Sequence, residues 1–407
     1  MQYRKIPKTG EELSILGFGC MRLPEKRGKI DEKRAKKQLL MAIDEGVNYF
    51  DTAMPYHMGA SETFLGKALS EAGVRKKINI ATKLPPWSVN KSEDMEKLIS
   101  VQLKKLKTDY IDYYLLHALN GEVFKKLNEF GVLKFLSKLK ADGIIRNAGF
   151  SFHGKSKDFK KIIDAYDWEF CQIQYNYLDV KNQAGKKGLE YAVEKDIGVI
   201  IMEALRGGNL GKKPPKEIKQ LWENSDTKRE PVEWSLEWIW NHPEVTAVLS
   251  GMNNEEHIIQ NIKIANKVLP ESMSQKDLEI VSKTEKLYRK LMKVGCTGCG
   301  YCMPCPSGVN IPGCFEHYNS YHVFNDKTNA KMNYLIFCGG LLSDKSSHAS
   351  LCEECGECEK VCPQGLPIIE LLKEVSNEFE GIKFRAFQKI AKIVMKFKHW
   401  NTMRKNG

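Results

Sequence analysis

The chain has 407 residues, of which 42% are hydrophobic and 28% are charged, and it carries a formal net charge of +12. This length exceeds what one hydrophobic core usually supports, so we expect two domains, or one large domain with an appendage. The sequence has no apolar run long enough for a membrane span and no apolar core of a secretory signal near its start, so we expect a cytoplasmic protein.

Short runs rich in β-branched or aromatic residues alternate with longer segments of helical period from about residue 15 to residue 265. Helical stretches such as Lys33–Glu45 and Lys91–Lys105 separate these runs. Eight strand–helix repeats of this spacing predict a closed parallel (β/α)8 barrel, or TIM barrel, of the α/β class. An open doubly wound sheet is the rival fold, but no Gly-x-Gly-x-x-Gly follows the first strand. The predicted strands are Ile15–Gly19, Tyr49–Asp51, Ile78–Lys83, Tyr110–His117, Ile145–Ser151, Phe170–Tyr175, Gly198–Met202 and Thr246–Ser250.

Two features after the seventh predicted strand bear on the domain boundaries. The segment Lys212–Glu230 contains two prolines and many charges, which is typical of an inserted loop. A helical stretch, Gln275–Lys293, then leads into a group of cysteines. We expect a barrel domain over residues 1–284, a small, mainly helical domain over residues 285–376, and a separate segment over residues 377–407.

Four polar side chains fall at or just after the ends of successive predicted strands. Asp51 ends the second strand and Tyr56 follows it, Lys83 ends the third strand, and His117 ends the fourth. Taken singly, each residue has a structural interpretation, from a helix cap for Asp51 to a buried core histidine for His117. Parallel barrels carry their active sites at the carboxyl ends of the strands. The joint placement at this end therefore favours catalysis.

Ten of the twelve cysteines follow position 295, and eight of them form two regular groups. The second group has the C-x2-C-x2-C-x3-C-P spacing of bacterial two-cluster ferredoxins, in which three close thiolates hold one cluster and the fourth reaches the other. This spacing predicts two 4Fe-4S clusters in the helical domain. One is held by Cys296, Cys299, Cys302 and Cys362, and the other by Cys352, Cys355, Cys358 and Cys305.

The first cysteine group leaves one ligand with an alternative. It has one residue fewer before its last cysteine, so Cys314 competes with Cys305, which we favour. Two zinc sites of four cysteines each are the other interpretation, but three cysteines in succession followed by Cys-Pro favour iron–sulfur clusters. Cys314 and Cys338 are otherwise expected to be packed thiols. The clusters either relay electrons or hold the appended domain together.

The positive charge is concentrated at the carboxyl end. Residues 381–407 contain eight basic and no acidic residues, so the rest of the chain is near balance, which argues against nucleic-acid binding. Between Phe384 and Trp400 the basic side chains share one face of a predicted helix, and apolar side chains cover the remainder. We expect this basic amphipathic helix to pack on its own domain or on a subunit. Contact with an anionic membrane or with an acidic ferredoxin-like partner is the alternative.

The four strand-end residues resemble the Asp, Tyr, Lys and His tetrad of the aldo/keto reductases. LGFGCMRLP at the first strand, GASETFLGKAL after Tyr56 and VTAVLSGM before HIIQN support the resemblance over about residues 1–265. With its cysteine groups, the whole chain is similar to the ferredoxin-bearing branch of that family. The resemblance implies that Tyr56 is the general acid, that Lys83 polarises it and pairs with Asp51, and that His117 orients a carbonyl for hydride transfer. We expect the Lys83 ammonium to lower the pKa of Tyr56 toward the working range.

The resemblance also implies contacts to a nicotinamide nucleotide. Ser151 and Gln172 match positions that hold the carboxamide, although Phe152 replaces the usual asparagine and Met202 replaces a stacking tyrosine. The loop Leu205–Leu210 resembles the segment that passes the pyrophosphate, which needs close backbone approach. The implied cofactor-binding residues are Gly19, Met21, Asp51, Ser151, Gln172, Met202, Leu205, Gly251, His257 and Asn261.

The adenosine end departs further from the family pattern. NADPH-specific relatives place a lysine and an arginine on the 2′-phosphate, where this sequence has Gly251 and His257, flanked by Glu255 and Glu256. Carboxylates disfavour a phosphate but accept ribose hydroxyls. We therefore expect NAD(H), or either NAD(H) or NADP(H), rather than strict use of NADP(H).

Three functions follow from these observations. The first is an anaerobe's NAD(P)-dependent oxidoreductase, which interconverts a small carbonyl/alcohol pair and exchanges electrons with a ferredoxin-like partner through its clusters. Clusters carry single electrons whereas a nicotinamide carries a hydride, so a flavin in the barrel would bridge the two. The second is a non-catalytic, cofactor-binding regulatory subunit, and the third is an iron–sulfur electron carrier with a vestigial barrel. The intact tetrad favours the enzyme.

Overall fold

The computed structural model describes residues 1–154, 156–296, 302–323, 327–340, 346–362, 365–382, 384–386 and 388. The chain divides into two compact units. The first comprises Met1–Gly211 and Ser225–Val281, and the second comprises Lys212–Asn224 and the described residues from Ser282 onward.

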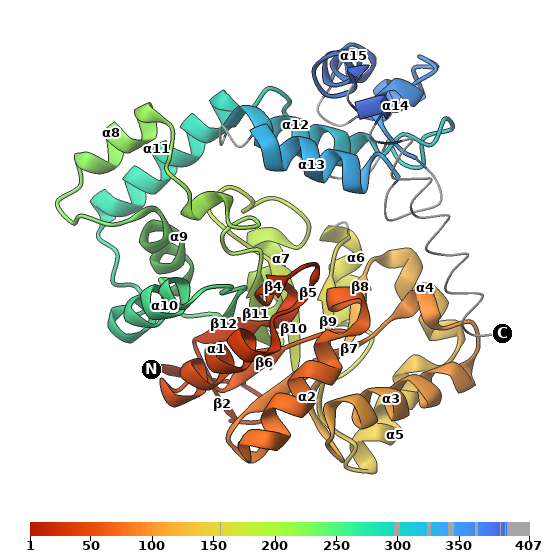
Figure 1. Cartoon of the computed structure of the whole chain (residues 1–407), viewed down its shortest axis with the longest axis vertical. Helices are drawn as coiled ribbons and strands as arrows, with labels where there is room; N and C mark the ends of the chain where they lie inside the picture. Colours follow the sequence, from red (N-terminus) through yellow and green to blue (C-terminus); the bar gives the residue numbers. More distant parts are fainter. Residues whose placement is uncertain are drawn as a thin grey trace. The chain divides into compact units, whose positions relative to one another are not determined.

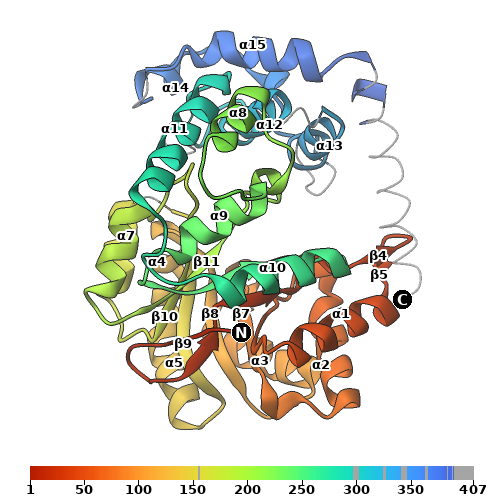
Figure 2. The same cartoon turned by 90° about the vertical axis from the view of Figure 1, so that its left-hand side faces the viewer.

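Eight parallel strands close into a barrel in the first unit, as predicted (Figure 1). Figure 2 shows strands β7 to β11 side by side. Strand β12 pairs with β3 through Val248 and Leu16, which closes the barrel. Every predicted strand overlaps an observed one. Around the barrel the strands are β3 (Leu16–Gly19), β6 (Tyr49–Asp51), β7 (Asn79–Leu84), β8 (Ile111–Leu119), β9 (Ile145–Phe152), β10 (Phe170–Gln174), β11 (Gly198–Met202) and β12 (Val245–Ser250).

Helices surround the strands and bury their apolar faces against them in one large core (Figure 1). Local sequence signals set several helix ends: Asp31 caps α1 by accepting a hydrogen bond from the Arg34 amide, and Asn254 caps α10 in the same way through the His257 amide. The helices of this part of the chain are α1 (Glu32–Asp44), α2 (Ser61–Ala72), α3 (Ser92–Leu106), α4 (Gly121–Glu129), α5 (Val132–Ala141), α6 (Ser156–Ile163), α7 (Gly185–Val193), α9 (Pro231–Trp240) and α10 (Glu255–Lys267).

Two hairpins that the sequence did not predict complete the barrel unit. Strands β1 (Tyr3–Lys5) and β2 (Glu12–Ser14) pair antiparallel, and Ile6 and Leu13 join the cluster of side chains that fills the barrel interior. This hairpin therefore closes the amino-terminal end of the barrel. A second hairpin, β4 (Glu25–Lys26) with β5 (Lys29–Ile30), follows β3 at the opposite end.

The second unit is mainly helical. The predicted loop Lys212–Glu230 in fact contains helix α8 (Lys216–Glu223), because Ile218 and Trp222, one turn apart, are both buried, and the Trp222 indole donates to Thr284 Oγ1 at 2.8 Å. A second hydrophobic core lies among α12, α13 and α15, and six cysteines pack against it. Helix α11 (Gln275–Leu291) begins in the first unit and ends in the second. The remaining helices of the second unit are α12 (Ile311–Val323), α13 (Lys327–Phe337), α14 (Glu357–Lys360) and α15 (Ile368–Phe379).

Among the helices that the structure describes, none has both the length and the apolar character needed to cross a membrane.

Candidate active site

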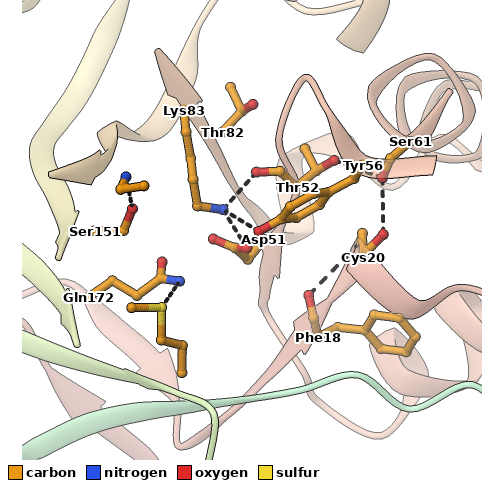
Figure 3. A network of polar contacts seen from close by, with 12 residues as sticks. Phe18, Cys20, Asp51, Thr52, Tyr56, Ser61, Thr82, Lys83, Ser151 and Gln172 are labelled. Carbon is orange, nitrogen blue, oxygen red and sulfur yellow. Dashed lines mark hydrogen bonds and ion pairs between the residues drawn. The ribbon is translucent and has the colours of Figure 1, made fainter. Parts of the chain in front are cut away.

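Three of the four predicted catalytic side chains meet at the carboxyl end of the barrel strands (Figure 3). Lys83, near the end of β7, places its Nζ atom 2.6 Å from Asp51 Oδ1 at the end of β6 and 3.4 Å from the hydroxyl of Tyr56. Asp51 and Lys83 are almost completely buried, with exposed side-chain fractions of 3% and 1%. Buried charges are tolerated only when they are paired, and here the Lys83 ammonium and the Asp51 carboxylate are partners beside the Tyr56 phenol.

Further hydrogen bonds, to a backbone carbonyl and between hydroxyl groups, hold this cluster in place. Lys83 Nζ also donates to the carbonyl oxygen of Thr52 at 2.9 Å, so three acceptors surround the ammonium. The hydroxyl of Thr52 lies 2.8 Å from that of Ser61, at the start of α2, and Ser61 donates to the carbonyl of Cys20 at 3.2 Å. These bonds connect β6, α2 and the segment after β3, and they hold the ammonium in place.

The pKa values of Lys83 and Tyr56 determine the charges in this cluster, and the pKa of Tyr56 differs from the prediction. Burial alone would lower the pKa of Lys83, but Asp51 and Tyr56 raise it above its ordinary value, so the ammonium persists. Burial raises the pKa of Tyr56, and this effect outweighs the opposing effect of Lys83. The expected net lowering of the Tyr56 pKa is therefore wrong, because desolvation of the phenolate dominates. Tyr56 therefore keeps its proton at neutral pH.

His117 lies beside this cluster on a distortion of strand β8. The pairing of β8 with β9 shifts register between Leu116 and Leu119, and Ala118 has a positive φ of 51°. The Ala118 amide donates to Ser151 Oγ at 2.8 Å, which holds the distortion. Such bulges re-aim a side chain at a strand end. The ring of His117 lies edge-on to that of Tyr56, with 6.3 Å between the ring centres.

His117 is neutral in this environment. Burial, with help from the Lys83 charge, lowers the pKa of His117 to about 3. Its Nδ1 atom is buried and has no hydrogen-bond partner among the described residues. A neutral imidazole can donate one hydrogen bond to a carbonyl oxygen at the barrel mouth, as the predicted orienting role requires.

The predicted carboxamide-binding residues also lie at this mouth. Ser151 and Gln172 are buried on adjacent strands, β9 and β10, and are paired in register. Gln172 Nε2 lies 3.5 Å from the sulfur of Met202, whereas Gln172 Oε1, like Asp51 Oδ2, is buried without a partner in the part of the chain that the structure describes. An orphaned amide oxygen beside a serine hydroxyl fits a planar amide ligand such as the nicotinamide carboxamide.

The predicted cofactor-binding residues Gly19, Met21 and Leu205 lie at the end of β3 or on the segments that follow β3 and β11. Gly19 ends β3, and a Cβ atom there would lie 3.4 Å from the carbonyl oxygen of Ser250. Met21 is 56% exposed, and Leu205 begins the loop in which Gly207 and Gly208 have φ values of 69° and 92°. These glycines leave the backbone open to a ligand.

The adenosine end contains a feature that the sequence did not predict. Gly251 and His257 are exposed, and Asn261 is buried and donates to Ser250 Oγ at 2.7 Å. Glu255 forms an ion pair with Arg34 of α1, with 2.8 Å between Nη2 and Oε2, and the hydrogen bonds from Arg34 lower the pKa of Glu255 to about 2. The carboxylate that was expected to repel a 2′-phosphate is therefore partly neutralised.

Two further side chains at the barrel mouth, Trp87 and Arg22, were not predicted from the sequence to belong to the site. Trp87 is 55% exposed, and its ring centre lies 5.2 Å from that of His117, so it places an apolar surface beside the imidazole. Arg22 packs against Gly251, and its guanidinium lies 3.4 Å from the position that a Cβ atom on Gly207 would take. The proline pair before Trp87 and the Arg-Leu-Pro that follows Met21 are the only sequence signals for these positions.

In the second unit, five of the predicted cluster ligands line one cavity of about 320 Å³. They are the four ligands predicted for one cluster, Cys305, Cys352, Cys355 and Cys358, together with Cys302 of the other predicted set. Cys314 is absent from the lining: it is fully buried and contacts the hydroxyl of Tyr334 at 3.8 Å. The cysteine-rich lining fits an iron–sulfur cluster, although Glu353 and Glu357 also line the cavity. Among the described residues, no group of three or more Cys, His, Asp or Glu side chains is already arranged to hold a metal ion.

The second predicted ligand set is described in part. Cys296, Cys302 and Cys362 pack against the same hydrophobic core, and Cys299 lies outside the described residues. Cys338 is fully buried, like Cys314.

The predicted basic helix falls mostly outside the described residues as well, from residue 389 onward. Its start packs on the second unit, where the ring centre of Phe384 lies 5.7 Å from that of Tyr334 and Gln388 Nε2 donates to the carbonyl of Gly339 at 2.9 Å.

Two family models match this chain. The aldo/keto reductase family matches residues 15–280, and a 4Fe-4S dicluster domain matches residues 295–366. The two matches coincide with the barrel and with the cysteine-rich unit.

Several known proteins are similar to the barrel. An uncharacterised oxidoreductase of Bacillus subtilis, YqkF, is 27% identical over 65% of this chain and 92% of its own length. L-galactose dehydrogenase of Arabidopsis thaliana is 26% identical over 69% of this chain and 93% of its own length. The solved structure of an aldo-keto reductase from Bacillus halodurans in its holo form has a TM-score of 0.59 and 26% identity, and covers 70% of this chain and 96% of that one.

Proposed function

The chain belongs to the aldo/keto reductase family, and on that premise we propose that it reduces or oxidises a small carbonyl/alcohol pair with a nicotinamide nucleotide. The observation that carries this proposal is the placement of Lys83 Nζ, 2.6 Å from Asp51 Oδ1 and 3.4 Å from the hydroxyl of Tyr56. This cluster unites a proton donor with a fixed positive charge at the carboxyl end of the barrel strands.

Each residue then has a distinct task. A reduced nicotinamide supplies the hydride when it is bound. Tyr56 donates its proton to the carbonyl oxygen, and the Lys83 ammonium stabilises the phenolate that remains. Asp51 keeps Lys83 charged, and neutral His117 donates a hydrogen bond that orients the carbonyl. In the oxidative direction the Tyr56 phenolate accepts the proton from the alcohol.

The proposed contacts to the nucleotide begin with Gln172 and Ser151. The orphaned oxygen of Gln172 would accept from the carboxamide N–H, and the Ser151 hydroxyl would donate to the carboxamide oxygen. The loop from Leu205 and the exposed Gly251 leave room for the pyrophosphate and the adenosine. One similar protein, of Schizosaccharomyces pombe, is named as an NADP(+)-dependent aldo-keto reductase, with 26% identity over 67% of this chain and 77% of its own length. Because Arg34 offsets Glu255, we propose that both NAD(H) and NADP(H) are accepted, with NAD(H) preferred.

We further propose that the second unit holds two 4Fe-4S clusters. Cys305, Cys352, Cys355 and Cys358 bind one, and Cys296, Cys299, Cys302 and Cys362 bind the other. The shared cavity of about 320 Å³ supports the first assignment. Cys355 is exposed, so the edge of the first cluster would reach the surface and could exchange electrons with a ferredoxin-like partner.

The test of the catalytic proposal is Tyr56→Phe in the full chain, purified without oxygen. The variant keeps the ring but has no proton to donate, so kcat for a small aldehyde should fall by about a thousandfold. The affinity for the nucleotide, measured by fluorescence quenching, should be unchanged. Near-normal turnover would contradict the role of Tyr56. Iron, sulfide and flavin analysis of the same preparation tests the cluster assignment and asks whether a flavin accompanies the nucleotide.

A further inference from the structure

The turn that carries Tyr56 has an unusual backbone. The next two residues, His57 and Met58, both take the left-handed conformation, with φ values of 51° and 55°. Non-glycine residues visit this region at a cost, and they stay there only where the surroundings hold them. The turn therefore needs an anchor, since a proton donor must stay in register with its substrate to within about an ångström.

The His57 side chain supplies that anchor. Its ring is 6% exposed, its Nε2 atom accepts from the Leu23 amide at 3.1 Å, and its Nδ1 atom lies 2.8 Å from Glu25 Oε1. A backbone N–H can only donate, so Nε2 must carry the lone pair and Nδ1 the proton. Glu25 accepts a hydrogen bond from this Nδ1–H group and so fixes the tautomer. The ring therefore bridges two different partners in one defined orientation.

The two partners lie on the segment that leaves strand β3. Leu23 is buried and immediately follows Met21 and Arg22, and Glu25 begins hairpin β4–β5. An unmade hydrogen bond at a buried amide is costly, so the Leu23 bond resists opening. His57 thus ties the Tyr56 turn to the segment on which the predicted nucleotide contact Met21 lies.

We propose that His57 is a positioning residue that locks the Tyr56 turn to the segment Cys20–Glu25 and so keeps the Tyr56 hydroxyl in register with Lys83. This inference rests on the proposed role of Tyr56 as proton donor. No contact with substrate or cofactor is assigned to His57.

Four variants distinguish the effect of the His57 side-chain hydrogen bonds from the effect of the left-handed backbone at this turn. His57→Gly and His57→Asn both tolerate a left-handed φ, but neither side chain can span Leu23 and Glu25. His57→Gln is longer and offers an amide donor and an acceptor, so it can restore one of the two bonds. Met58→Gly is the matched control, because Met58 has the same backbone conformation but its side chain is 92% exposed.

The readouts are kcat and KM for whichever member of a panel of small aldehydes and ketones the wild-type chain reduces fastest with NADH. We expect His57→Gly and His57→Asn to lower kcat by about tenfold to a hundredfold, while KM for NADH changes by less than about twofold. His57→Gln should recover part of kcat, and Met58→Gly should behave as wild type. Equal losses in kcat for His57→Gly and Met58→Gly would overturn the proposal, as would normal kcat in His57→Gly.

Hydrogen exchange of the peptide that contains Cys20–Lys26 gives a second readout that does not depend on turnover. Loss of the Leu23 bond should speed exchange of this peptide by about tenfold or more in His57→Gly and leave it unchanged in Met58→Gly. Unchanged exchange in His57→Gly would overturn the anchor even if the catalytic proposal stands. Normal turnover in Tyr56→Phe would instead refute the catalytic proposal while leaving the anchor testable by exchange.

Discussion

The barrel mouth and the cysteine-lined cavity are built in opposite ways. At the barrel mouth the functional groups are buried on adjacent strands of a closed sheet, and they are already paired with one another, as Lys83 is with Asp51. In the second unit the five thiols around the cavity are half-buried or exposed, and they come from loops and from one short helix, α14. The sheet holds the first site in place, whereas the metal itself would bring the second site together.

This difference predicts that iron removal affects the two units unequally. Chelation under reducing conditions should abolish the cooperative unfolding transition of the second unit, because the proposed clusters would join cysteines that are far apart in the sequence. The transition of the barrel should persist within a few degrees. Calorimetry of the full chain before and after chelation measures both. Loss of both transitions together would show that the barrel also depends on the metal.

A charge substitution at the barrel mouth should have the next largest effect. Lys83→Met leaves the carboxylate of Asp51 buried without a counter-ion, so we expect a loss of about 3–5 kcal/mol in the free energy of unfolding at neutral pH. The loss should shrink at lower pH, where Asp51 takes up a proton. Urea unfolding followed by tryptophan fluorescence measures it.

Lys67→Met is the matched control, because Lys67 pairs with Glu32 at 2.8 Å on the surface. Exposed ion pairs contribute little, so this variant should unfold like the wild type. Equal destabilisation by both substitutions would contradict the importance of burial at Lys83.

The neutral His117 predicts a pH effect of moderate size. Its folded pKa of about 3 lies below the ordinary value near 6.5, so the unfolded chain binds more protons between these values. His117 therefore contributes stability that is fully present above about pH 6.5 and is lost as the pH falls toward 3. His117→Gln should flatten this dependence, as urea unfolding between about pH 5 and pH 7 would reveal. An unchanged slope would mean that other histidines set it.

The smallest effect is expected at the adenosine end. Arg34→Ala frees the Glu255 carboxylate, which should weaken NADPH binding by a few-fold more than NADH binding, since only NADPH carries the 2′-phosphate. Competition titrations with the two nucleotides give the ratio. A gain in NADPH affinity would show that Glu255 does not face the phosphate.

The two regions also differ in how much their sequences reveal. The strands of the barrel were predictable because alternation of apolar runs and helical periods is local, and Asp51 and Lys83 could be placed because both stand near strand ends. The β1–β2 hairpin was missed, since its strands are only three residues long. The bulge at Ala118 was missed too, because nothing marks alanine as left-handed.

Properties that depend on the surroundings of a side chain in the folded protein, such as its pKa, were the least predictable from the sequence. The pKa of Tyr56 rises because burial outweighs Lys83, and no spacing encodes burial of that degree. The choice between Cys305 and Cys314 was open in the sequence. Cys305 lines a cavity with Cys352, Cys355 and Cys358 whereas Cys314 does not, and this supports the proposal that Cys305 is the ligand.

We propose that the barrel transfers a hydride directly between nicotinamide and carbonyl while Tyr56 supplies the proton, and isotope labelling tests this most directly. Under anaerobic single-turnover conditions, a nicotinamide deuterated at its transferring carbon should give an alcohol that keeps the deuterium on the former carbonyl carbon. An alcohol whose label has been lost to water would contradict direct transfer and would indicate that electrons leave the nicotinamide by another route.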